Sequence, residues 1–147
     1  MKKFRLLAVV ALLPATVLAQ SFNFKAIGNA PTVMYDAPTQ KGIKRFIAPP
    51  GMPVEVVHVS GSWSKVRDVA GDMTWVETKD IGGKHMVVVT AGNAKVRLRN
   101  DESAPPVFSA DKGVLLEIAE PVASGWIKVR HRDGQTGFVR ATEVWGG

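Results

Sequence analysis

Short apolar runs separated by glycine and proline make up the chain beyond its first twenty residues. The segment Val54–Val59 begins with alternating apolar and polar residues, which is the period of a strand with one buried face. Short runs bounded by turn residues are typical of an all-β protein. We therefore predict strands at residues 22–27, 32–35, 54–59, 63–69, 73–77, 86–90, 94–98, 114–118 and 126–130.

The segments between these runs are assigned from their polar, glycine and proline content. Residues 39–50, which carry three cations and end in Pro49-Pro50-Gly51, are predicted to form a long loop. Residues 99–111 are predicted to form a second long loop, and residues 78–80 a single turn of helix. Gly82-Gly83-Lys84 lies between the two halves of the chain and has the composition of a linker.

The chain contains an internal repeat. The segment Trp63–Ile81 matches Trp126–Val144 at a constant offset of 63, over nineteen positions and without a gap. A repeat of this length indicates two copies of one small domain. We place the first copy at residues 20–82 and the second at residues 83–147.

The offset changes once within the repeat. The segment that begins at Val114 matches the segment that begins at Val54 at an offset of 62. The second copy therefore contains one extra residue within 121–125, which we assign to a turn, because turns tolerate insertions.

The size of each copy restricts its architecture. About five short strands in about 60 residues cannot form an open sheet with both faces covered, so we predict a small, strongly bent barrel. A domain of this size buries a modest fraction of its surface and is marginally stable alone. We therefore expect contact between the two repeats.

The first residues have the pattern of a secretory signal peptide. Met1–Arg5 is basic, Leu6–Val17 is apolar, and Val17 and Ala19 place small residues at a cleavage site. The apolar run is shorter than the roughly 20 residues needed to span a bilayer, which argues against a membrane anchor. We expect cleavage after Ala19 and a periplasmic or secreted protein that does not span the membrane.

Removal of the signal changes the charge. Lys2, Lys3 and Arg5 leave with it, so Lys+Arg falls from 19 to 16 against 13 acidic residues, and the net charge falls from +6 to +3. This mild charge, together with export, argues against a nucleic-acid partner. The sequence contains no cysteine, which excludes disulfides, a cysteine nucleophile and thiolate metal ligands.

The second copy carries the motifs of a known family. These are Val96-Arg97, Gly113, Gly125-Trp126-Ile127-Lys128-Val129 and Asp133-Gly134-Gln135-Thr136-Gly137-Phe138-Val139. In this order they resemble the bacterial SH3-like domain, with Phe138 in place of the usual tryptophan. In the first copy, Ser62 and Thr74 replace two glycines of the pattern. The resemblance covers the chain after the signal peptide and implies two tandem SH3-like β-barrels.

The resemblance also suggests a type of function. Such domains are accessory modules of exported bacterial proteins, where they attach to cell-wall peptidoglycan or to a partner protein and often accompany cell-wall hydrolases. The two repeats occupy the chain after the signal peptide, so we expect no hydrolase domain beside them. A fold alone does not define a function.

Strand alternation defines a candidate binding face. Along Trp126–Arg130 the aromatic and cationic side chains share one side, while Ile127 and Val129 share the other, which we expect to face the core. The first copy has the same arrangement. The candidate ligand-binding residues are therefore Trp63, Lys65, Arg67, Trp126, Lys128 and Arg130. Such a face can stack on a sugar ring or a proline while its cations meet a carboxylate or a phosphate. The alternative is that each tryptophan packs under a neighbouring strand or against the other repeat.

Other side chains are weaker candidates. We expect Tyr35, Trp75 and Phe138 to lie in the core, and the cations of residues 39–50 to be solvated. The three histidines lack the spacing of a metal site, so we expect neither a metal nor another cofactor. No serine lies on a nucleophile elbow, and no pair of carboxylates stands out for glycoside hydrolysis.

Three functions are consistent with these observations. The first is a non-catalytic, exported binding module that recognises peptidoglycan or a peptide segment of an envelope protein, with avidity if both repeats engage. The second is a structural or scaffolding envelope protein whose second repeat stabilises the first. The third, a small cell-wall hydrolase, is the least favoured because it requires a deep polar pocket.

Overall fold

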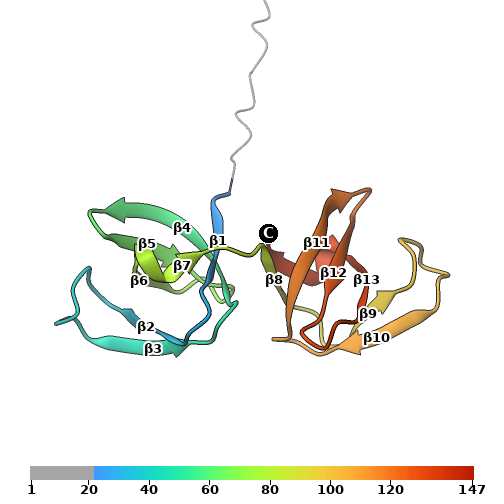
Figure 1. Cartoon of the computed structure of the whole chain (residues 1–147), viewed down its shortest axis with the longest axis horizontal. Coiled ribbons are helices and arrows are strands. Elements are labelled where there is room, and N and C mark those ends of the chain that lie inside the picture. Colours follow the sequence, from blue (N-terminus) through green and yellow to red (C-terminus); the bar gives the residue numbers. More distant parts are fainter. Residues whose placement is uncertain (1–21) are drawn as a thin grey trace, which may run out of the picture.

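The structure, a computed structural model, describes residues 22–147, so the signal peptide predicted at residues 1–19 lies outside the described residues. Two antiparallel sheets of seven strands each lie side by side (Figure 1). The first sheet contains β1 (Phe24–Ile27), β2 (Thr32–Tyr35), β3 (Lys44–Ala48), β4 (Pro53–Ser60), β5 (Trp63–Arg67), β6 (Met73–Glu77) and β7 (Ile81–Gly82). The second sheet contains β8 (Met86–Val89), β9 (Ala94–Arg97), β10 (Pro106–Ala110), β11 (Leu115–Ala123), β12 (Trp126–Arg130), β13 (Thr136–Arg140) and β14 (Val144–Gly146).

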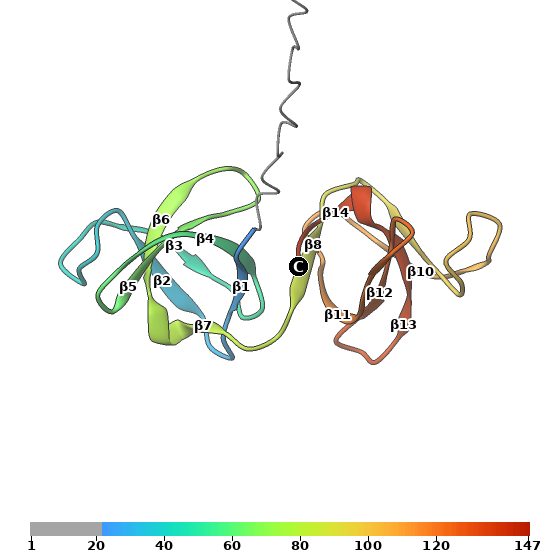
Figure 2. The same ribbon diagram turned by 90° about the horizontal axis from the view of Figure 1, so that it is seen from above.

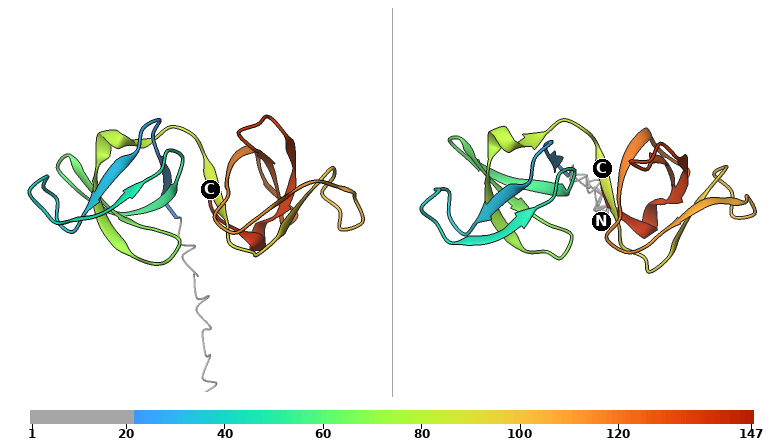
Figure 3. Two further views of the ribbon diagram at one scale, coloured as in Figure 1. Left: turned by 90° about the horizontal axis from the view of Figure 1, so that it is seen from below. Right: turned by 60° about the horizontal axis from the view of Figure 1, so that its bottom comes forward.

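Both sheets have the same strand order. It is β3-β2-β6-β5-β4-β1-β7 in the first and β10-β9-β13-β12-β11-β8-β14 in the second. A single 3-10 turn follows β6 at Thr78–Asp80 (η1) and β13 at Ala141–Glu143 (η2). The duplicated sequence therefore folds into two copies of one topology, and each sheet bends around its own core (Figure 3). The all-β prediction and the turn of helix predicted at residues 78–80 are confirmed.

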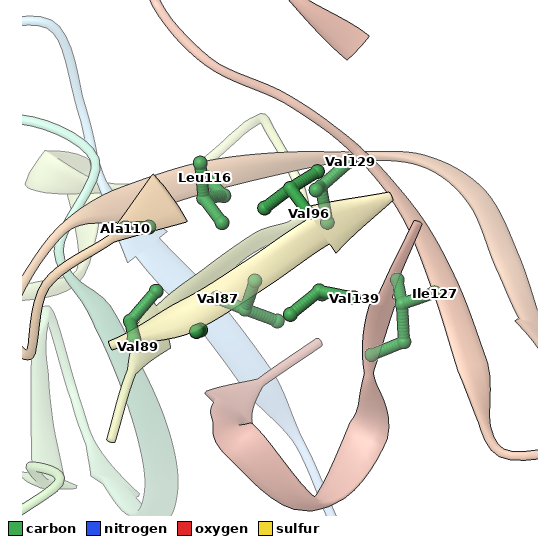
Figure 4. Packing of buried hydrophobic residues seen from close by; sticks show 9 residues of the cluster. Val87, Val89, Val96, Ala110, Leu116, Ile127, Val129 and Val139 are labelled. Carbon is green, nitrogen blue, oxygen red and sulfur yellow. The ribbon is translucent and has the colours of Figure 1, made fainter. Parts of the chain in front are cut away.

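Each repeat encloses a separate apolar core. In the second repeat, valines from β8, β9, β12 and β13 converge with Leu116 and Ile127 (Figure 4). The first core is smaller and contains Ile27, Met34, Ala48, Val54, Val66 and Val76. Fully burying one such side chain stabilises the fold by about 1.5–3 kcal/mol. The inward-facing positions of each strand supply these residues, as strand alternation predicts.

One glycine permits a close crossing of two strands in the second repeat. A Cβ atom on Gly137 in β13 would lie 2.7 Å from the carbonyl oxygen of Arg97 and 2.8 Å from Cγ1 of Val96. The first repeat has the buried residue Thr74 at the corresponding position. The two copies therefore pack this crossing differently, although their strand order is the same.

The prediction of two long loops is wrong, because each contains a strand. β3 lies within residues 39–50, and β10 lies within residues 99–111. Each is an edge strand of its sheet and fully buries only its last residue, Ala48 or Ala110. An edge strand pairs on one side only and needs little apolar surface, so its composition is close to that of a loop.

The extra residue of the second repeat lies in a strand and not in a turn. The β4–β5 register ends at Ser60–Trp63 and the β11–β12 register at Ala123–Trp126, so both hairpins have turns of the same length. The β11–β12 register shifts twice, whereas the β4–β5 register shifts once. A bulge between Glu120 and Ala123 therefore accommodates the insertion, and the predicted strand 114–118 continues to residue 123.

The two repeats contact each other through β14. The ring of Trp145 meets the ring of Phe24 edge-on, with centroids 5.0 Å apart. A Cβ atom on Gly146 would lie 2.9 Å from Cβ of Pro53 in the first repeat. Accordingly, the C-terminus lies between the repeats in Figures 1 and 2. Within residues 22–147, no helix is long and apolar enough to cross a membrane.

Candidate functional site

Strands β5 and β12 divide their side chains between two faces. Ser64 and Val66 of β5, and Ile127 and Val129 of β12, point into the cores and are buried. The six candidate ligand-binding residues therefore occupy the opposite, outer faces of the two sheets. Their contacts differ between the repeats, and their role in binding stays a prediction.

The outer face of the first repeat is rich in aromatic side chains. Trp63 is half-buried and packs edge-on against Tyr35, with centroids 5.5 Å apart. Trp75 lies opposite Lys65 across the β5–β6 pair and meets the ring of His58 at 6.1 Å. We call this surface, formed by Tyr35, His58, Trp63, Lys65 and Trp75, the aromatic face.

Tyr35, Trp75 and Phe138 are predicted to lie in the core, but the structure places all three, half-buried, on the outer faces of their sheets. Strand alternation could have assigned Trp75 correctly, because its neighbours Thr74 and Val76 are the inward-facing pair. Tyr35 and Trp75 are paired residues of β2 and β6, which brings Tyr35 to the same surface.

Arg67 is held in an ion pair within the first repeat. Its Nε donates a hydrogen bond to Oε2 of Glu55 at 2.9 Å, and its Nη2 contacts the same oxygen. Glu55 is only 8% exposed, so this guanidinium compensates a carboxylate that is almost removed from water. Arg67 therefore has a structural role, whereas Lys65 has no carboxylate partner among the described residues.

The outer face of the second repeat is closed by its own side chains. The guanidinium of Arg140 lies over the ring of Trp126, 4.4 Å from its centroid, and Trp126 is only 6% exposed. Arg140 in turn donates a hydrogen bond from Nε to Oε1 of Glu102 at 2.6 Å. Lys128 pairs with Glu120, and its Nζ lies 5.9 Å from the centroid of the Phe138 ring.

The residue opposite the tryptophan differs in charge between the two faces. Residue 77 faces Trp63 across the β5–β6 pair, and residue 140 faces Trp126 at the corresponding place in the second repeat. Glu77 accepts a hydrogen bond from Nε2 of Gln40 at 2.5 Å, and this bond, with help from Lys79, lowers the pKa of Glu77. A carboxylate is not attracted to the face of an aromatic ring as a guanidinium is, so Trp63 is not covered in this way.

A cleft of about 1170 Å³ lies between the two repeats. Its lining comes from segments 27–32, 50–51 and 79–86, and from segments 114–117 and 130–134 of the second repeat. We call this the inter-repeat cleft. Arg130, the last of the predicted ligand-binding residues, is exposed and lines this cleft, away from the stacked pair of Arg140 and Trp126.

The described residues offer little acid–base or metal chemistry. Within residues 22–147, no three His, Cys, Asp or Glu side chains come together so that they could hold a metal ion. His131 and Asp133 form a pair at 3.0 Å in the turn before β13. The pKa of Asp133 is lowered first by the backbone N–H of Gln135 and also by His131, which is the hydrogen bonding of a polar turn.

The sequence was compared with models of known protein families. The family model described as the bacterial SH3 domain matches twice, at residues 28–83 and 91–146. No curated protein matches the chain.

Several solved structures also match the chain. NlpC2 from Trichomonas vaginalis has 8% identity and a TM-score of 0.40, with 87% of this chain and 49% of that one covered. NlpC1 from the same organism has 11% identity and a TM-score of 0.39, with 95% and 50% covered. An NlpC/P60 family protein from Bacillus cereus ATCC 10987 has 15% identity and a TM-score of 0.36, with 84% and 56% covered. The chain thus spans about half the length of each of these structures.

Each family match covers one sheet except for its first strand, β1 or β8, and together they leave few of the described residues uncovered. The tandem SH3-like architecture implied by the motifs is therefore confirmed, and this chain belongs to the bacterial SH3 domain family.

Proposed function

We propose that this protein is an exported, non-catalytic binding module whose first repeat attaches it to cell-wall peptidoglycan. The observation that carries the proposal is the aromatic face, where three half-buried aromatic rings share one surface with a lysine that has no carboxylate partner among the described residues. Bacterial SH3 domains often bind cell-wall components, are often extracellular and are typically non-catalytic. The signal-peptide pattern of the first residues supports export.

The chemistry of the aromatic face fits a glycan with attached peptides. The C–H faces of a sugar ring pack well against an aromatic ring, and Trp63 and Trp75 present large rings on one surface. Lys65 lies on β5 two residues after Trp63 and opposite Trp75, and it can donate charge-assisted hydrogen bonds to a carboxylate. The corresponding face of the second repeat is already occupied by Arg140, so one repeat is expected to dominate binding.

Co-sedimentation with purified peptidoglycan sacculi tests the proposal. The protein without residues 1–19 is mixed with sacculi at low and at high salt, and the retained fraction is measured. We expect retention that survives high salt, because ring stacking is not screened by ions. Loss of retention at high salt would indicate that charge alone holds the protein, and no retention at either salt would overturn the proposal.

The duplication supplies a matched pair of variants. Lys65→Gln removes the cation of the aromatic face, whereas Lys128→Gln removes the corresponding cation of the second repeat, which pairs with Glu120. We expect weaker retention of Lys65→Gln at low salt and unchanged retention of Lys128→Gln. Trp63→Ala should lower retention at both salt concentrations, with circular dichroism used to show that the variant is folded.

A peptide segment of an envelope protein is the second candidate ligand. The edge strand β3 and the residue before it expose two large apolar side chains, Ile43 and Ile47, which are 65% and 66% exposed. An unpaired strand edge can bind an extended peptide as an additional strand. Absence of binding to sacculi, together with capture of one envelope protein that is lost in Ile47→Lys, would favour this candidate.

A further inference from the structure

An ion pair present in the first repeat is absent from the second. Glu55 and Arg67 are paired residues of β4 and β5, and Glu117 and Arg130 are the corresponding paired residues of β11 and β12. Arg67 contacts Glu55. Glu117 instead pairs with Lys84 of the linker, with Nζ and Oε2 3.7 Å apart.

Arg130 therefore does not form the ion pair that Arg67 forms in the first repeat. It is exposed and lines the inter-repeat cleft together with Arg132. Neither guanidinium has a carboxylate partner within residues 22–147. Two cations without partners, next to each other on one wall of a cleft, form a surface that favours an anionic ligand.

The rest of the cleft adds apolar surface to this charge. Leu115 and Met86 from the second sheet, and Ile27 and Pro50 from the first, contribute to the lining. The charged residues of the lining are Lys79, Lys84, Arg130 and Arg132 against Asp80 and Glu117, an excess of two positive charges. The volume of about 1170 Å³ is slightly above the roughly 300–1,000 Å³ of common small-ligand pockets. An apolar lining with a cationic wall fits a short peptide that carries a free carboxylate.

We propose that the inter-repeat cleft is a second binding site, which takes a carboxylate-bearing peptide through Arg130 and Arg132. The guanidinium groups donate charge-assisted hydrogen bonds to the carboxylate, and the apolar lining covers the peptide side chains. This inference rests on the proposed wall binding, and it identifies the occupant as the stem peptide of peptidoglycan, while sugar rings contact the aromatic face. Since both repeats and the linker line the cleft, the site requires the tandem arrangement.

Soluble muropeptides, released from sacculi by a muramidase, are the probe for this site. Their affinity for the protein is measured by calorimetry for the wild type, for Arg130→Gln/Arg132→Gln and for the control Arg45→Gln/Arg99→Gln. The control removes the same charge from two exposed arginines that do not line the cleft. We expect the cleft variant to bind at least about tenfold more weakly than the control, which corresponds to the loss of about 1.4 kcal/mol.

Changes to the ligand test the carboxylate directly. Muropeptides whose carboxylates have been converted to amides should bind the wild type as weakly as unmodified muropeptides bind the cleft variant. Equal affinity of the cleft variant and its control, or an undiminished affinity for amidated muropeptides, would overturn the cleft site while leaving the attachment to sacculi intact. Failure of the wild type to bind sacculi would instead contradict the proposed function.

A second arm separates the wall from a protein ligand. A synthetic acidic peptide of unrelated sequence is titrated under the same conditions. If it binds through Arg130 and Arg132 as tightly as the muropeptides do, the cleft recognises carboxylates in general and the assignment to the stem peptide is overturned. Weaker binding of the acidic peptide supports the assignment.

Discussion

The two repeats have the same strand order, but the tryptophan on the outer face is partly exposed in the first repeat and covered in the second. In the first, Trp63 is half-buried and packs edge-on against Tyr35. In the second, Arg140 stacks on Trp126, and Glu102 fixes Arg140 in place. The core keeps valine at two matching positions, Val66 with Val129 and Val76 with Val139, whereas the side chains that cover the outer faces differ.

The comparison identifies one position that decides whether the tryptophan is covered. The residue opposite the tryptophan is a carboxylate in one repeat and a guanidinium in the other. A guanidinium is attracted to the face of an indole ring, and a carboxylate is not. A tandem protein can therefore keep one copy for binding while the other contributes to stability through the same residue positions.

Replacing each tryptophan by alanine should give the largest difference in stability between the two repeats. Trp126 is 6% exposed, so Trp126→Ala leaves a cavity and should lower the free energy of unfolding by about 3–5 kcal/mol. Trp63 is only half-buried, and Trp63→Ala should lower it by less than about half as much. Urea unfolding followed by circular dichroism measures both values. Equal losses would contradict the view that only the second face is closed.

The two corresponding arginines, Arg67 and Arg130, should differ next in their effect on stability. Arg67→Gln leaves the buried carboxylate of Glu55 without its charged partner and should lower the free energy of unfolding by about 1–3 kcal/mol. Arg130→Gln removes an exposed cation without an ion pair among the described residues and should change it by less than about 0.5 kcal/mol.

A double variant isolates the cause of the Arg67 effect. Arg67→Gln/Glu55→Gln replaces both charges, so no unpaired carboxylate remains and part of the stability should return. If the double variant is as unstable as Arg67→Gln, the loss comes from packing of the arginine stem and not from the unpaired charge.

Much of the fold was predictable because alternation and duplication are properties of the sequence itself. The offset of 63 aligned β5 with β12, and alternation placed Val66 and Val129 in the cores. The edge strands β3 and β10 were missed because they bury little surface and have the composition of loops. The bulge near Pro121 was assigned to a turn, since sequence alignment places an insertion but does not reveal its geometry.

The site was less predictable than the fold. Alternation shows which face a side chain occupies, but it does not show which residue of another strand reaches it. Arg140 stacks on Trp126, and it is held by Glu102, which is far away in the sequence, in the loop that joins β9 to β10. The inter-repeat cleft depends on the packing of β14 against the first repeat, for which the sequence carries no local signal.

Removal of the residue that covers Trp126 should have a smaller effect than removal of Trp126. Arg140→Gln loses a cation–π contact and a largely exposed ion pair, so the free energy of unfolding should fall by about 1 kcal/mol. Glu102→Gln keeps the stacked guanidinium and should cost less than about 0.5 kcal/mol. Faster hydrogen exchange of the Trp126 indole N–H in Arg140→Gln would show that the ring has become uncovered. An equal cost for both variants would show that the ion pair, and not the stacking, holds the face closed.

The smallest expected effect concerns the pKa of Glu77, the carboxylate opposite Trp63. The hydrogen bond from Gln40, with help from Lys79, lowers the pKa of Glu77 below its ordinary value of 4.5. Since the folded-state pKa is depressed, this contact stabilises the protein above the unfolded-state pKa, and its contribution is lost as the pH falls through the folded-state value. Gln40→Ala should therefore raise the pKa of Glu77, as measured by NMR titration of its carboxyl carbon.

Gln135→Ala is the matched control for this titration, because it removes a glutamine side chain in the second repeat and should leave the Glu77 titration unchanged. An unchanged pKa in Gln40→Ala would mean that Lys79 alone sets the charge of Glu77. The loop between β2 and β3 would then be free to move away from the aromatic face, and the two repeats would differ in the mobility of this loop as well as in charge. A raised pKa would instead show that the same loop position restrains the strand end in both repeats, through an amide in one and a carboxylate in the other.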